Sequence, residues 1–167
     1  MSDAAESAHV SLLMADYANV DPQGKLNIVG GGITGLGCEV ASGAVTAPHA
    51  VVAVVSFGAE FVGESPAVEL SLEDENGALV ELPGSAGVPE FLRVGHVGQL
   101  EPLRLQGLYI PKDAVRPSVQ FVMHFATGLP LPPGHRYVWR VRVDHETKAE
   151  WTYVFYVPEP ASPPVLG

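Results

Sequence analysis

The sequence is poor in cysteine, and its first residues lack the pattern of an export signal. Cys38 is the single cysteine among 167 residues, so an intrachain disulfide is excluded and a reducing compartment is expected. The opening segment MSDAAESAHVSLL is acidic and has no basic region followed by an apolar run, unlike a secretory signal. We therefore expect a protein that is not secreted.

Basic residues are also scarce, above all in the first half of the chain. The net charge is −10, and Lys25 is the single base among residues 1–90. A nucleic-acid-binding protein needs a basic field to replace the counterions of phosphate, so no nucleic-acid partner is expected. The acidic half is interpreted as a solubility feature, and the alternative is a face that docks on a basic partner or on another copy.

Long apolar runs and helical windows are missing as well. The longest purely apolar run is AVVAVV at residues 50–55, far too short for a membrane span, so no membrane association is expected. Eighteen glycines and fifteen prolines interrupt the chain, and no clear window of ten or more residues keeps helical spacing. Without crossover helices, a parallel α/β fold is excluded.

What the sequence does contain is apolar residues at period two, which is typical of half-buried strands. Residues 49–57 are apolar on both faces and predict a central strand. Asn76-Gly77 predicts a hairpin turn, because both central positions of such a turn need a positive φ. Alternating segments predict further strands at 10–14, 25–29, 67–73, 78–82, 102–110, 118–125, 137–143 and 151–157.

These segments predict an all-β fold, an antiparallel β-sandwich of the immunoglobulin-like or jelly-roll-like kind with about eight or nine strands. Leu103 and Leu105 are expected to point inward, and Trp139 and Trp151 to pack between the sheets. We expect one sandwich domain over 9–157, an N-terminal arm over 1–8 and a Pro-rich C-terminal arm over 158–167.

The stretch NIVGGGITGLG places Gly30, Gly32 and Gly35 on the G-x-G-x-x-G spacing of a dinucleotide-binding turn. That motif needs a helix beginning at the third glycine, and an acidic residue about 20 positions later on a second strand. Gly37, Gly43 and Pro48 interrupt the region after the motif. The three glycines are therefore interpreted as a structural bend, and an enzyme using FAD or NAD is the least favoured reading.

The segment ADYANVDPQGKLNIVGGG (15–32) is similar to the start of an uncharacterised bacterial and bacteriophage family of unknown function. The resemblance extends to FATGLPLPPGHRYVWRVRVD (125–144), where that family has a Leu-Pro loop followed by a Tyr that opens a strand. It implies no catalytic residue, and it implies that the glycines are structural. It also implies a location in the bacterial cytoplasm or in a virion.

No other pattern predicts catalysis or metal binding. Six histidines are scattered without the spacing of a zinc site. Cys38 has an acidic neighbour, Glu39, which is the wrong environment for a nucleophilic thiolate. EDENG at 73–77 lacks the ligand spacing of a calcium loop. We therefore expect no enzyme, no cofactor and no metal.

The favoured function is a non-enzymatic interaction protein that binds protein subunits of a larger assembly, such as a phage capsid that it decorates. It would use exposed sheet edges, residues 1–9 and the C-terminal arm, and a homo-oligomer is an alternative arrangement. A cytoplasmic small-molecule or carbohydrate-binding module is the second hypothesis. The candidate contact residues are Tyr156, His124, Pro158, Pro160, Pro163, Pro164, Val165 and Leu166.

Overall fold

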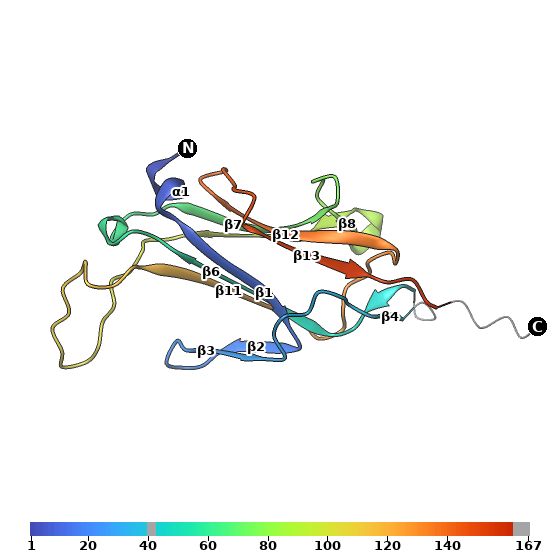
Figure 1. The fold of residues 1–167 in the computed structure, drawn as a ribbon, viewed down its shortest axis with the longest axis horizontal. Coiled ribbons are helices and arrows are strands. Elements are labelled where there is room, and N and C mark those ends of the chain that lie inside the picture. Colours follow the sequence, from blue (N-terminus) through green and yellow to red (C-terminus); the bar gives the residue numbers. More distant parts are fainter. Residues whose placement is uncertain (40–42, 162–167) are drawn as a thin grey trace, which may run out of the picture.

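The computed structural model describes residues 1–39 and 43–161 (Figure 1). The predicted all-β fold is confirmed, although thirteen strands replace the expected eight or nine. One sheet has the order β1-β6-β11 and the other the order β10-β7-β12-β13, and all pairings within them are antiparallel. These strands are β1 (His9–Ala15), β6 (His49–Ser56), β7 (Ala67–Asp74), β10 (Arg93–Val97), β11 (Ser118–Phe125), β12 (His135–Val143) and β13 (Thr152–Val157).

The remaining strands form three short antiparallel pairs beside the two sheets. They are β2 (Tyr17–Val20) with β3 (Leu26–Val29), β4 (Cys38–Glu39) with β5 (Val45–Thr46), and β8 (Glu81–Leu82) with β9 (Glu90–Phe91). Three single-turn helices complete the described part of the chain: α1 (Asp3–Ser7) and the 3₁₀ turns Ala59–Phe61 and Ser85–Gly87.

The strand order favours the immunoglobulin-like alternative over the jelly roll. In chain order, the first, second and fifth main strands form one sheet, while the fourth, third, sixth and seventh form the other. A constant-type immunoglobulin domain has the same order, except that its fourth strand belongs to the first sheet. Here β10 pairs with β7, so the fourth strand has moved to the second sheet.

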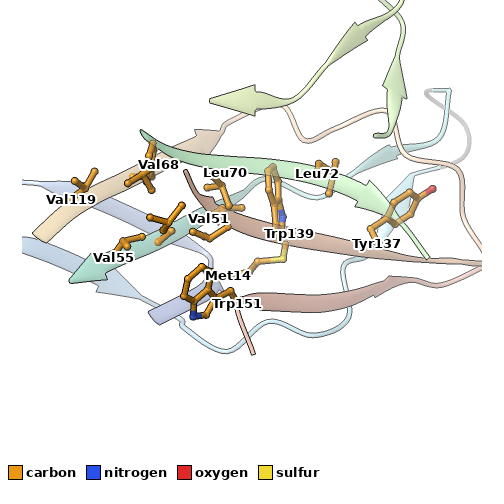
Figure 2. Close-up of a cluster of buried hydrophobic side chains, with 14 of the residues drawn as sticks. Met14, Val51, Val55, Val68, Leu70, Leu72, Val119, Tyr137, Trp139 and Trp151 are labelled. Carbon is orange, nitrogen blue, oxygen red and sulfur yellow. The ribbon is translucent and has the colours of Figure 1, made fainter. Parts of the chain in front are cut away.

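The core lies between the two sheets and follows the predicted period of two (Figure 2). Met14 and Val51 contribute to it from the first sheet, and Leu70 from the second. Trp139 and Trp151 are both buried, as predicted. Burial of one aromatic or aliphatic side chain of this kind contributes roughly 1.5–3 kcal/mol to the free energy of folding. Packing of these side chains between the sheets therefore accounts for much of the stabilisation of the fold.

A second, smaller core explains why β6 is apolar on both faces. The β2–β3 hairpin turns back over the outer face of the first sheet, where β2 lies against β6 and β11 (Figure 1). Ala18 of the hairpin packs there against Ala50 and Val52. The inner face of β6 meets the main core, and its outer face meets this hairpin.

The expected N-terminal arm is not an extended arm. The Ser2 side chain caps α1 by accepting a 3.1 Å hydrogen bond from the Ala5 amide. Ala4, Ala5 and Ala8 are buried against the main core. The Ser2 hydroxyl donates to Asp144 at 2.9 Å, which ties the segment to the turn after β12. The sandwich covers the short apolar face of α1. This burial stabilises the segment as a helix packed on the domain, in place of a free arm.

Candidate protein-interaction site

The connection between β10 and β11, residues 98–117, projects from one end of the molecule (Figure 1). The chain was expected to form a strand over 102–110 with Leu103 and Leu105 inward, and this prediction is wrong. Both side chains are about half exposed, and the segment pairs with no strand among the described residues. Gly107 adopts a φ of +77° in a turn closed by the Leu108 amide and the Leu105 carbonyl at 3.1 Å, which interrupts the extended run.

Both ends of this loop are held by the sandwich. At the start, Leu100 is buried, and it exchanges two 2.8 Å backbone hydrogen bonds with Gly63 and Glu64. At the end, the Arg116 guanidinium donates to the Ser7 carbonyl at 2.8 Å, and the Pro117 carbonyl accepts from the Phe57 amide at 2.9 Å. The fixed ends determine where the middle of the loop stands.

The middle of the loop presents apolar side chains to solvent. Tyr109 is 91% exposed and Leu108 is 66% exposed. Leu103, Leu105 and Val115 add further exposed apolar surface to the same segment. A loop of more than about 15 residues without secondary structure is uncommon in a compact domain and is usually functional. Exposed apolar side chains gathered on one element make it a candidate contact surface, because they gain free energy when a partner excludes water from them.

The structure does not bring the predicted contact residues together. His124 is exposed on β11 of the first sheet, where its ring forms a T-shaped pair with the Tyr17 ring at a centroid distance of 5.2 Å. Tyr156 is on β13 of the second sheet and is 43% exposed. Pro158 and Pro160 are exposed after β13. The remaining candidates, Pro163, Pro164, Val165 and Leu166, lie outside the described residues.

The glycine motif forms a corner followed by an edge contact. Gly30 has a φ of +66°, and a side chain there would overlap the Asp16 carboxylate. After the corner, the Leu36 amide donates to the Tyr156 carbonyl, and the Tyr156 amide donates to the Thr34 carbonyl, both at 2.9 Å. Gly35 thereby pairs in parallel with Tyr156. No helix begins at Gly35 within the described residues, so the arrangement that a dinucleotide-binding turn requires is not present there.

A charged network that the sequence did not predict covers the outer face of the second sheet. Glu73 is 1% exposed, and its carboxylate accepts hydrogen bonds from Arg140 at 2.7 Å and from Arg142 at 2.5 Å. Arg142 also donates to the Ser71 hydroxyl at 2.8 Å, and Arg93 donates to Glu69 at 2.5 Å. The buried Glu73 carboxylate is therefore balanced by two guanidiniums within the sheet, as a buried charge requires.

Two titratable side chains have pKa values displaced by burial. Burial lowers the pKa of His49, whose Nδ1 donates to the Ala47 carbonyl at 2.9 Å while its ring packs 5.0 Å from that of Phe125. Burial likewise raises the pKa of Tyr137. Within the part of the chain that the structure describes, His49 Nε2 and Trp139 Nε1 are buried without a hydrogen-bond partner. Both side chains are fully buried.

Among residues 1–39 and 43–161, no group of three or more His, Cys, Asp or Glu side chains is placed to hold a metal ion. In the same ranges, no helix is long and apolar enough to cross a membrane. Comparison with known proteins gives no match to any family model, curated protein or solved structure. The candidate site therefore stands on the geometry of the 98–117 loop alone.

Proposed function

We propose that this protein is a non-enzymatic interaction module that docks on protein subunits of a larger assembly through the 98–117 loop. The observation that carries the proposal is the exposed apolar surface at Leu108 and Tyr109, on a loop held at both ends. Aromatic and large apolar side chains that become buried at the centre of an interface supply most of its binding free energy.

Two further features support this proposal. Because both ends of the loop are fixed, the unbound loop samples fewer conformations. It therefore loses less conformational entropy on binding. Residues 98–117 contain Arg104, Lys112 and Arg116 against Glu101 and Asp113, a net charge of +1 on a chain of net charge −10. The loop therefore does not share the acidic character of the rest of the chain, and it can approach an acidic partner surface.

The specific form of the proposal is a component of a phage virion that decorates the capsid. It rests on the resemblance of residues 15–32 to a bacterial and bacteriophage family, and on an immunoglobulin-like sandwich that presents a contact loop at one end. In this arrangement the sandwich is a rigid carrier and the loop makes the contact. The Pro-rich segment from residue 158 would add a second, weaker contact.

Cosedimentation tests the proposal directly. Purified protein is mixed with capsids assembled from the capsid protein encoded nearest to its gene, and the bound fraction is measured. The double variant Leu108→Ser, Tyr109→Ser is expected to weaken binding by at least about tenfold. The matched control is Val88→Ser, because Val88 is 64% exposed but lies outside the loop. If the double variant binds like the wild type, or if no capsid binding is found, the proposal is overturned.

A further inference from the structure

The outer edge of β11 has no neighbour among the described residues. β11 lies at the end of its sheet and pairs on one side only, with β6. The 2.9 Å hydrogen bond from the Phe57 amide to the Pro117 carbonyl shows that residue 117 bonds toward β6. Since an antiparallel strand alternates in direction, residues 119, 121, 123 and 125 also bond toward β6. The backbone N–H and C=O groups of residues 118, 120, 122 and 124 therefore point away from the sheet.

The other sheet edges are partly covered by other segments or are formed by a short strand. β13 is bordered by residues 34–36, which hydrogen-bond both the amide and the carbonyl of Tyr156. The edge of β1 is partly occupied, because the Met14 carbonyl accepts from the Gly32 and Ile33 amides at 2.8 and 3.2 Å. β10 is exposed but short, and it carries Arg93 and Gly95. Short strands, charges and covering segments are the usual protection of an edge.

β11 has none of these protections. Its sequence SVQFVMHF is eight residues long and contains no proline, lysine, arginine or carboxylate. Val119 and Phe121 anchor its inner face in the core, so the strand is held straight while its outer backbone groups remain available. An edge of this kind is a template for another strand.

We propose that a second copy of this chain pairs with β11, antiparallel and about a two-fold axis, so that the two three-stranded sheets join into one of six strands. This goes beyond the docking loop, because it assigns a different surface and a different partner. A copy of β11 is a suitable occupant because the strand carries no carboxylate or permanently charged base that would repel itself. Most other segments of this chain, with its net charge of −10, would bring carboxylates to the contact.

The direction of the free backbone groups also limits the register. Only pairings that place even-numbered residues opposite one another use those groups. With Val122 on the axis, Gln120 lies opposite His124 of the second copy, and Phe121 lies opposite Met123 of the second copy. The Gln120 amide can hydrogen-bond the imidazole, and the aromatic–thioether pair is favourable on the inner face.

The β2–β3 hairpin enlarges this interface. Tyr17 packs edge-on against His124, and across the hairpin it pairs with Val29. Tyr17 is 44% exposed and Val29 is 61% exposed. Because Gln120 of the second copy arrives opposite His124, these exposed side chains border the seam. Strand pairing alone buries little area, and the hairpins supply the apolar surface that a stable dimer needs.

Sedimentation velocity of the full chain over a range of micromolar concentrations tests the proposal. The wild type is expected to form a dimer. Gln120→Pro removes an outward N–H from each copy and is expected to raise the dissociation constant at least about tenfold, because proline is tolerated on an edge but cannot donate to a new strand. The matched control Gln120→Thr keeps the N–H and is expected to remain dimeric. Gln120→Lys removes the amide that hydrogen-bonds the imidazole and brings one ammonium group from each copy to the seam, and it is expected to raise the dissociation constant of the dimer.

Circular dichroism spectra equal to that of the wild type show that each variant is folded. A monomeric wild type, a dimer that both Gln120→Pro and Gln120→Lys leave intact, or polydisperse aggregates in place of a two-copy species would each overturn the proposal. The loop variant Leu108→Ser, Tyr109→Ser is expected to stay dimeric. Failure of the capsid-docking proposal and failure of the dimer proposal are therefore seen in different variants.

Discussion

The phenol oxygen of Tyr137 donates a 2.8 Å hydrogen bond to the carbonyl oxygen of Pro132, five residues earlier in the chain. Tyr137 lies near the start of β12, immediately after the loop that crosses from one sheet to the other. The bond has the geometry of the tyrosine corner of immunoglobulin-like sandwiches, which lies at the crossing between their fifth and sixth strands. The bond fixes the loop while the ring fills the core.

Removing this hydroxyl is expected to weaken the crossing. Tyr137→Phe leaves the Pro132 carbonyl without its donor in a partly buried place, and we expect it to lower the free energy of unfolding by about 1–2 kcal/mol. Urea denaturation measures this change. Tyr156→Phe is the control, because that ring is exposed, and it should change stability by less than about 0.5 kcal/mol. Equal effects of the two substitutions would contradict this role of the hydroxyl.

The buried carboxylate of Glu73 is expected to be the most sensitive charge in the protein. Glu73→Gln leaves Arg140 and Arg142 without their shared anion, although both guanidiniums keep some contact with solvent. Loss of one partner from a buried ion pair costs about 3 kcal/mol. Glu101→Gln breaks the exposed pair with Arg104 and should cost no more than about 0.5 kcal/mol. Urea denaturation of the two variants compares the buried ion pair with the surface ion pair. Similar losses in the free energy of unfolding would show that burial of Glu73 is unimportant.

Acid is expected to destabilise the fold through His49. Burial lowers the pKa of this imidazole in the folded protein below its ordinary value of 6.5. Between these two pKa values the unfolded chain binds the proton more readily, so stability is retained above about pH 6.5 and falls as the pH decreases below it. His49→Asn keeps a donor near the Ala47 carbonyl but cannot titrate there. Unfolding free energies at about pH 7.5 and about pH 5.5 should therefore differ less in the variant than in the wild type. Equal pH dependence in both proteins would exclude His49 as the cause.

Glycine is expected to be required at position 128 for two separate reasons. Gly128 has a φ of +71°, and an added Cβ would overlap the Thr46 carbonyl oxygen. Gly107 has a similar φ of +77° with open space around it. Gly107→Ala should therefore show the backbone strain alone, about 1 kcal/mol. Gly128→Ala should cost about 3 kcal/mol, because the loop must also move away from β5. Thermal unfolding of the two variants separates strain from steric overlap, and equal losses would mean that the Thr46 contact yields without cost.

The elements that could be predicted from the sequence are those in which apolar and polar side chains alternate, because burial of the apolar face determines what packs against them. The apolar run at 50–55 became the central strand β6, and Trp139 and Trp151 became core residues. Period two carries this information because one face of each strand must leave water. By contrast, β10 was missed, since its sequence RVGHV is short and contains a glycine, and its pairing with β7 depends on distant residues.

The errors have the same origin. Leu103 and Leu105 alternate like strand residues, but no neighbouring strand reaches them, and a local pattern cannot show the absence of a partner. Glu73, Arg140 and Arg142 come into contact through the register of β7 with β12, which the sequence of neither strand specifies alone. Part of the 98–117 loop was therefore assigned as a strand, and the charged network was not predicted.

The pairing of residues 34–36 with Tyr156 has a consequence for synthesis on the ribosome. A segment made early stays without its hydrogen-bonding neighbour until the last strand has been translated. One edge of β7 likewise stays unpaired until β12 has been translated, which happens only after the whole 98–117 connection. Contacts this distant in sequence slow folding, because a large loop must close before they contribute any stability. Residues 34–36 and one edge of β7 therefore stay unpaired for most of synthesis, and these are the segments that a chaperone acting on the nascent chain would have to protect longest.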